Sequence, residues 1–480
     1  MRAVLRIVGF ELLPTPNSHR GTGQPRSTNM SSSHFTISHA FPFGNTSSSL
    51  ERIGILLCAF AFLGPLVAAQ QLARRSFIGI TLEKKGSSFF VTDVAPQSSA
   101  QQAGVLQGDV LLRIGNVPIQ GPQSLDIAAR RYRSGSRLTF LVLRSGHHFT
   151  KGTLALPFPP ENRSNADVLY MSVSVDGYLH RMIVTKPRTP GLYPAVFLIG
   201  GLGCYSLDNL SPDGTGYGWI IDGFAQAGFV TVRIEKSGEG DSEGPPCTSK
   251  VASLKLAADR SIAGINKTAT LPFVNAEKIF ILAHSVGPVE GALAISKVHV
   301  AGFVASETVG TSWFEYTVET ARHQQLLLGA TYDDVEHEAR LTDKCIFFLE
   351  VAKESPRRII RSHPECASYI PVQGGAPYTY FQDLADVNLP TEWKQANVPV
   401  LVTYGSSDPL TSSAQSHYLV ELVNSFHPGN AEYLLIEGMS HHFDQQPSEA
   451  SALQALLTGH DGPYLPEFLD RVLEWIRNVK

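Results

Sequence analysis

The sequence KIFILAHSVGPVEGALAI, residues 278–295, decides the fold of this chain. Residues 278–282 are mainly apolar and include β-branched side chains, which predicts a buried strand. Residues 290–295 have the composition of a helix. Between the two, residues 283–287 place Ser285 at the apex of a tight turn that has a small residue two positions away on either side. The pattern predicts a serine hydroxyl held clear of a sheet; an ordinary strand-to-helix turn that happens to contain Ser and Gly is the alternative.

Strand and helix patterns alternate along the chain from residue 168 onward. Apolar runs that predict strands lie at 194–199, 229–234, 300–305, 399–404 and 433–436. Two further runs, 168–175 and 179–186, are separated by Asp176-Gly177, which predicts a hairpin. This alternation is typical of an α/β fold with a largely parallel sheet covered by helices.

Three polar residues follow predicted strands in the order Ser285, Asp408, His441. Parallel α/β sheets place their chemistry beyond the carboxyl ends of the strands, so these side chains are expected to meet. A histidine can take the proton of a serine near neutral pH, and an aspartate can orient the imidazole. His442 is the alternative base, and Glu307 is the alternative acid.

These motifs resemble the α/β-hydrolases, whose nucleophile lies on a strand-turn-helix elbow and whose triad has this order. Ala283 stands where the family usually has glycine, and Gly200-Gly201 stands where it often has His-Gly. The resemblance implies that the backbone N–H groups of Leu202 and Val286 form the oxyanion hole. It also implies that residues 311–395, which interrupt the strand rhythm, form a helical cap.

Residues 74–146 form a separate unit. Strand patterns at 89–91 and 138–143 and a helix pattern at 124–133 surround the run AGVLQGDVLLRIGN, residues 103–116. This unit resembles the PDZ domains of exported bacterial proteins, which bind peptide carboxyl termini beside a strand edge. The resemblance implies that the carboxylate-binding loop consists of Phe77, Ile78, Gly79 and Ile80. A PDZ fold retained only for packing is the alternative.

The first 69 residues are predicted to be an extension that carries an export signal. Residues 53–69 are apolar, contain Gly64-Pro65, and end in Val67-Ala68-Ala69, small residues suited to cleavage. We therefore expect a periplasmic or secreted protein, with an uncleaved membrane anchor as the alternative. Residues 147–165 are predicted to be a linker, and residues 166–480 are predicted to be the hydrolase domain.

The composition limits the partners of the chain. Its 480 residues suggest two or three domains, and a net charge of −4 without a basic run gives no support for nucleic-acid binding. No Cys or His spacing suggests a metal site, and no cofactor is predicted. The expected ligands are a small ester or peptide substrate and a peptide carboxyl terminus.

Four cysteines follow the predicted signal: Cys204, Cys247, Cys345 and Cys366. Three pairings are possible by count. Cys204 and Cys247 follow neighbouring strand predictions, and loops after parallel strands emerge at the same sheet edge, which favours pairing these two. Cys345 would then pair with Cys366 in the cap; four unpaired thiols are the alternative.

The combined features predict a serine hydrolase that cleaves carboxylic esters through an acyl-enzyme on Ser285. A serine peptidase of the aminopeptidase type would use the same three residues. A rival of another class is a peptide-binding PDZ protein whose hydrolase domain is not catalytic.

Overall fold

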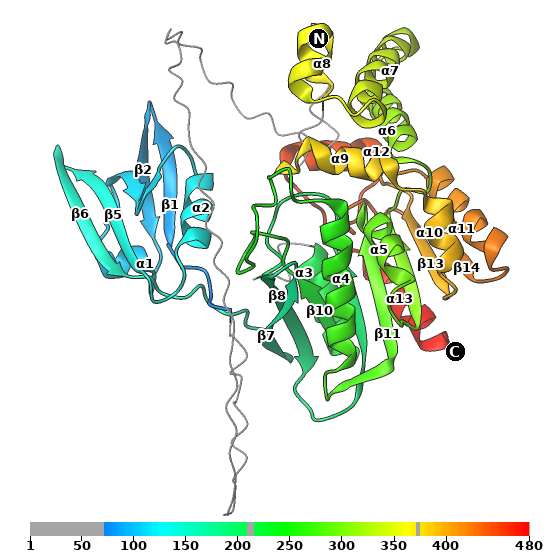
Figure 1. The fold of residues 1–480 in the computed structure, drawn as a ribbon, viewed down its shortest axis with the longest axis horizontal. Coiled ribbons are helices and arrows are strands. Elements are labelled where there is room, and N and C mark those ends of the chain that lie inside the picture. The colour runs from blue at the N-terminus through cyan, green and yellow to red at the C-terminus, as the bar shows by residue number, and fades with distance from the viewer. Residues whose placement is uncertain (1–71, 209–215, 371–374, 480) are drawn as a thin grey trace, which may run out of the picture. The chain divides into compact units, whose positions relative to one another are not determined.

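The computed structural model describes residues 72–208, 216–370 and 375–479, which form two sheets with their helices (Figure 1). The predicted export signal at 53–69 lies outside these ranges. Within them, no helix combines the length and the apolar character needed to cross a membrane.

The first sheet is antiparallel and has the order β1-β2-β3-β5-β6, with β4 paired to β3. Its strands are β1 (Ile80–Lys85), β2 (Ser88–Val94), β3 (Val110–Ile114), β4 (Val117–Pro118), β5 (Arg137–Arg144) and β6 (His147–Leu154). Two helices belong to this unit, α1 (Ser99–Ala103) and α2 (Gln123–Arg131). Its core consists of inward-facing strand residues such as Val91, Leu111, Ile114, Phe140 and Val142.

Strand β6 lies where the sequence predicts a linker. Residues 147–154 pair with the whole of β5, from Arg144↔His147 to Arg137↔Leu154. Most of the β6 side chains are exposed, so this strand lacks the apolar alternation that marks a strand in sequence. Its pairing is determined by the neighbouring strand and not by its own composition.

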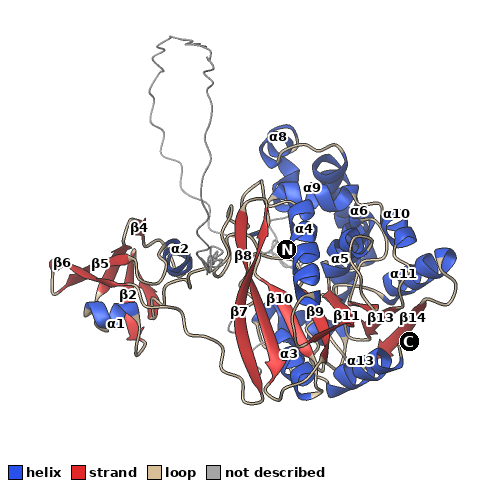
Figure 2. Ribbon diagram, turned by 60° about the horizontal axis from the view of Figure 1, so that its bottom comes forward, coloured by secondary structure: helices blue, strands red, loops and turns tan. Residues whose placement is uncertain are grey.

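The second sheet has the order β14-β13-β12-β11-β9-β10-β8-β7. Its strands are β7 (Ala166–Val175), β8 (Tyr178–Pro187), β9 (Tyr193–Ile199), β10 (Val230–Ile234), β11 (Val274–His284), β12 (Gly302–Ser306), β13 (Val400–Gly405) and β14 (Ala431–Ile436). The predicted hairpin is confirmed as β7 and β8, and β8 is antiparallel to β10, whereas the strands from β10 to β14 are parallel. This order, with the third and fourth strands exchanged, is that of the α/β-hydrolase fold (Figure 2).

Helices cover both faces of this sheet and enclose two apolar cores (Figure 2). One core contains side chains of α4 (Leu254–Ala269), α5 (Gly287–Ile295), α10 (Leu389–Gln395) and α11 (Ser413–Phe426). The other contains side chains of α3 (Gly216–Gln226) and α13 (Pro466–Asn478). Because both faces are covered, every residue of β10, β12 and β13 is buried, as is usual for strands of parallel sheets.

Between β12 and β13 the chain is mainly helical. The elements are α6 (Trp313–Leu327), α7 (Tyr332–Ile346), a π-helical turn (Phe347–Val351), α8 (Pro356–Ser362), a 3-10 turn (Pro364–Ser368), α9 (Tyr378–Asp386) and α10. A capping box of Ser312 and Glu315 starts α6. Thr320 and Gln324 of this helix donate hydrogen bonds to the carbonyls of Leu410 and Pro409, so α6 packs on the loop that follows β13. The remaining helix, α12 (Glu449–Thr458), lies after β14.

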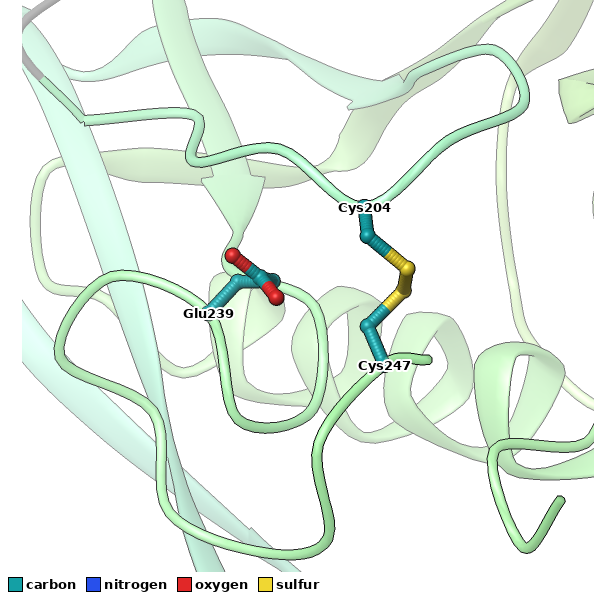
Figure 3. A group of neighbouring side chains, drawn as sticks. All are labelled: Cys204, Glu239 and Cys247. Atoms are coloured by element: carbon teal, nitrogen blue, oxygen red, sulfur yellow. A yellow bond between two sulfur atoms is a disulfide. The ribbon is translucent and has the colours of Figure 1, made fainter. Parts of the chain in front are cut away.

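Both predicted disulfides are confirmed: Cys204 pairs with Cys247, and Cys345 pairs with Cys366. Figure 3 shows the first pair together with Glu239, whose carboxylate lies within 4.8 Å of both sulfurs. This trio has donor atoms close enough to ligate a metal. Because both sulfurs are committed to the disulfide, neither is a thiolate, the form in which cysteine binds metal.

We expect the Cys204→Ser/Cys247→Ser double variant to lose about 4 kcal/mol of unfolding free energy, since the bond closes a loop of 43 residues. The matched Cys345→Ser/Cys366→Ser variant should lose about 3 kcal/mol, because its loop spans 21 residues. Urea denaturation of the three oxidised proteins measures both losses. If the Cys204→Ser/Cys247→Ser variant were as stable as the wild type, the expected stabilisation by this disulfide would be contradicted.

Candidate active site

Ser285 lies between β11, which ends at His284, and α5, which begins at Gly287. Its φ is +62°, in the left-handed region that non-glycine residues seldom occupy, and its N–H donates to the Ser306 carbonyl at 2.9 Å. A Cβ at Gly287 would lie 2.6 Å from the carbonyl oxygen of Ile199, so only glycine fits there. The strand, turn and helix expected at residues 278–295 are therefore present, and Ser285 lies at the strained apex.

The loop after β9 passes directly over Ser285. A Cβ on Gly201 would lie 3.2 Å from the Ser285 Cβ, which is close enough to favour glycine at this position. The Gly201 N–H donates to the Tyr217 hydroxyl at 2.8 Å. Within the described residues, the N–H groups of Leu202 and Val286 make no hydrogen bond, so both predicted oxyanion donors are available for a ligand.

Lys236 holds this loop in place, although no motif in the sequence marks it. Its ammonium group donates to the carbonyls of Gly201 at 2.7 Å and Gly203 at 2.6 Å. Burial lowers the pKa of Lys236 to about 7. Lys236 is the second residue after β10, at the same sheet edge as the predicted site. This position is the only sign in the sequence that Lys236 belongs to the site.

Asp408 and His441 are brought together by the loops after β13 and β14. His441 Nδ1 lies 2.9 Å from Asp408 Oδ2, and both residues are buried. Asp408 also accepts hydrogen bonds from the backbone of Leu410 and from the backbone and hydroxyl of Thr411. Burial opposes the ionisation of Asp408, but the charge of His441 and the hydrogen bonds to the carboxylate outweigh it and hold the pKa well below its usual range.

A chain of hydrogen bonds ties His441 to the serine turn. The Tyr217 hydroxyl lies 2.6 Å from His284 Nδ1, and His284 Nε2 lies 2.9 Å from the carbonyl oxygen of His441. Burial and the neighbouring His441 lower the pKa of His284 well below its ordinary value, so the ring is neutral. A neutral ring can accept from Tyr217 and donate to His441 at the same time, and the residue before Ser285 thereby anchors the backbone of the candidate base.

The other candidates lie in different surroundings. His442 is half-exposed, and its Nδ1 lies 3.4 Å from Asp461 Oδ1.

In the described part of the chain, Ser285 Oγ and His441 Nε2 form no hydrogen bond with each other. Such catalytic hydrogen bonds often tighten only when substrate binds.

Glu307, the alternative acid, contacts Asp408 instead of a histidine. Its Oε2 accepts the Gly405 N–H at 3.0 Å, whereas its Oε1 is buried and makes no hydrogen bond with the described residues. Burial and the charge of Asp408 raise the pKa of Glu307 well above its ordinary value, so Glu307 is the protonated one of these two carboxyl groups.

Glu307→Gln should make stability less dependent on pH. The pKa of Glu307 in the folded protein lies above its unfolded value of about 4.3. The protonated Glu307 therefore contributes its full share of the unfolding free energy below that pH. This contribution is lost as the pH rises through the folded-state pKa. A carboxamide can still accept the Gly405 N–H, but it does not titrate. Urea unfolding between pH 5 and pH 9 measures the slope, with exposed Glu437→Gln as control; a variant slope equal to the wild type would contradict the assignment.

The predicted carboxylate loop of the first unit precedes strand β1. The Phe77 N–H donates to the Leu156 carbonyl at 2.8 Å, whereas the N–H groups of Ile78 and Gly79 make no hydrogen bond with described residues. Gly79 has a φ of +67°, and a Cβ there would lie 2.2 Å from the Ser98 Cβ. Strand β1 pairs only with β2 in the described part of the chain, which leaves its other edge open beside these two N–H groups.

Comparison with known proteins gives one family and several solved structures. Residues 76–151 match the family model of the PDZ domain. Solved structures with similarity include DcsB in complex with a substrate analogue (17% identity, TM-score 0.42, covering 65% of this chain and 100% of that one) and Est1E from Butyrivibrio proteoclasticus (16%, 0.39, 66% and 100%). The Pyrococcus furiosus esterase Pf2001 is another (14%, 0.38, 67% and 98%). No curated protein matches the chain. A PDZ domain at residues 76–151 is thus followed in this chain by a domain whose strand order is that of the α/β-hydrolase fold.

Proposed function

We propose that this chain is a serine hydrolase that cleaves carboxylic esters through an acyl-enzyme on Ser285. The observation that carries the proposal is the link between the serine turn and the histidine-aspartate pair. Ser285 has positive φ at the end of β11, its neighbour His284 is bonded to His441, and His441 is bonded to Asp408.

In this mechanism the Ser285 hydroxyl attacks the ester carbonyl while its proton passes to His441 Nε2. The N–H groups of Leu202 and Val286 donate to the oxyanion, and each such donor typically contributes about 2.7–4 kcal/mol to transition-state stabilisation. Collapse breaks the ester C–O bond, and His441 returns the proton to the leaving alcohol. Water then attacks the acyl-enzyme through the same base, which regenerates Ser285 and releases the acid. Asp408 stays ionised, orients the imidazole and stabilises the imidazolium.

The test combines a covalent probe with two substrate classes. A fluorophosphonate should label Ser285, as peptide mapping can show, and p-nitrophenyl esters should be hydrolysed faster than aminoacyl p-nitroanilides. Preference for the anilides would favour a peptidase. Folded protein that neither reacts with the probe nor turns over any substrate would contradict hydrolase function.

We further propose that the PDZ domain binds peptide carboxyl termini with an apolar last residue. The unbonded N–H groups of Ile78 and Gly79 supply donors for a carboxylate, and the open edge of β1 supplies a strand for β-augmentation. Calorimetry of the full chain with peptides that differ only in a free or amidated carboxyl terminus tests this proposal. Equal binding of both forms, or binding of neither, would contradict it.

Export is also a proposal. Two disulfides are consistent with an oxidising compartment outside the cytoplasm. Expression with the native amino terminus, followed by cell fractionation and amino-terminal sequencing, should find the protein outside the cytoplasm with a start near Gln70. An uncut protein in the membrane fraction would favour an anchor.

A further inference from the structure

A small cavity lined by both apolar and charged residues lies beside the loop that passes over Ser285. It has a volume of about 40 Å³, and its lining includes Leu202, Lys236, Arg260, Glu290, Pro377 and Tyr380. A water needs about 10–15 Å³ by this measure, so the cavity has room for roughly three waters or one carboxylate group. The lining residues come from the loops after β9 and β10, from α4 and α5, and from α9 with the residue before it.

Arg260 is a buried cation without a hydrogen-bond acceptor. Only 7% of the residue is exposed, and none of its N–H groups makes a hydrogen bond with the described residues. Its nearest carboxylate oxygen is Glu290 Oε1, at 3.9 Å from Nη2, and that oxygen already accepts the Ser261 hydroxyl at 2.6 Å. A guanidinium carries five N–H donors, and leaving them unpaired in a buried place is costly. The geometry therefore calls for an acceptor in the cavity.

The charges around the cavity favour an anion as that acceptor. Lys236 and Arg260 contribute two basic groups to the lining, and Glu290 contributes one acidic group. When protonated, Lys236 uses two of its three donors on the carbonyls of Gly201 and Gly203, so one remains. A planar guanidinium binds a carboxylate through two parallel hydrogen bonds, which matches the size and the chemistry of this space.

The cavity adjoins the proposed reaction centre. Leu202, one of its walls and a proposed oxyanion donor, follows Gly201, which lies against the Ser285 side chain. Glu290 lies on α5, the helix that begins two residues after Ser285. A group bound between Leu202 and Glu290 would therefore lie beside two elements that also position Ser285.

We propose that this cavity binds a free carboxylate of the substrate through Arg260, and that the preferred substrates are monoesters of dicarboxylic acids. The inference rests on the proposed ester hydrolysis and adds the substrate class. The ester group reacts at Ser285, and the second carboxylate of the same molecule pairs with Arg260. Neutral esters of equal length lack this contact.

The test compares monomethyl glutarate with methyl pentanoate, which has the same acyl chain length without the carboxylate. In wild-type protein kcat/KM should be higher for monomethyl glutarate. Arg260→Gln should lower the ratio of the two kcat/KM values by roughly 10- to 100-fold, as expected for loss of charged hydrogen bonds. Lys267→Gln removes an exposed cation from the same helix and should leave the ratio unchanged. An unchanged ratio in Arg260→Gln, or a wild-type preference for methyl pentanoate, would overturn the inference.

A binding measurement separates failure of this inference from failure of the proposed function. Glutarate should bind to the Ser285→Ala protein by calorimetry, and Arg260→Lys in that background should weaken binding at least several-fold, because lysine keeps the charge but loses the bidentate geometry. If no ester is hydrolysed but glutarate binding depends on Arg260, the esterase proposal fails and the carboxylate site stands. If glutarate does not bind and the ester ratio shows no preference, the site is refuted. If Arg260→Gln does not fold, Arg260→Lys replaces it in the comparison of the two esters.

Discussion

Ser285→Ala should lower ester hydrolysis by about 10⁴- to 10⁶-fold and leave the fold intact. The expected loss is large because the hydroxyl forms and breaks the covalent bond, and comparable substitutions in serine hydrolases remove most of the catalytic acceleration. The fold should persist because the change removes one oxygen atom and keeps the Ser285 N–H bond to Ser306. Steady-state kinetics with a p-nitrophenyl ester and thermal unfolding of the same samples measure both effects.

The matched control is Ser425→Ala, which removes the hydroxyl of an exposed serine in α11. This variant should keep wild-type turnover and should still react with a fluorophosphonate. Retention of more than a few per cent of activity in Ser285→Ala, with a normal unfolding curve, would show that another residue is the nucleophile.

The placement of Ser285, Asp408 and His441 could be predicted because each follows a strand that is easy to recognise. Apolar runs predict buried parallel strands, and the carboxyl ends of parallel strands meet at one edge of a sheet. Sequence spacing alone therefore brings Asp408 and His441 to the same edge, and the structure joins their side chains at 2.9 Å. The Cys204–Cys247 pair follows from the same reasoning.

The supporting contacts could not be predicted, because they depend on side-chain directions and not on strand order. Lys236 reaches back to two carbonyls of a loop more than 30 residues away in sequence. In sequence Glu307 is an alternative to Asp408 as the acid, yet burial and the charge of Asp408 raise the pKa of its carboxyl group in the folded protein. In sequence Arg260 is an ordinary basic residue of an amphipathic helix; only its burial without a hydrogen-bond acceptor among the described residues makes it distinctive. Edge strand β6 was missed for a related reason, since its neighbour determines its pairing.

His441→Ala should be nearly as damaging as the serine change, with a loss of about 10⁴- to 10⁶-fold in kcat. Without the imidazole the proposed base for the Ser285 proton is lost, and Asp408 loses one of its hydrogen-bond donors. The remaining rate should come from the oxyanion donors and from substrate binding alone. The measurement is kcat for the same p-nitrophenyl ester, together with the rate of fluorophosphonate labelling, which should fall in parallel because labelling also needs the activated hydroxyl.

The adjacent histidine provides the discriminating control. His442 pairs with Asp461 and not with Asp408, and its side chain is 45% exposed, so His442→Ala should change kcat less than about threefold. Both substitutions delete the same atoms from neighbouring positions on one loop, so a general disturbance of the loop would lower both rates alike. A severe His442→Ala effect with a mild His441→Ala effect would transfer the role of base to His442. The expected order instead follows from Asp408, since only the imidazole that it orients can present Nε2 to the serine.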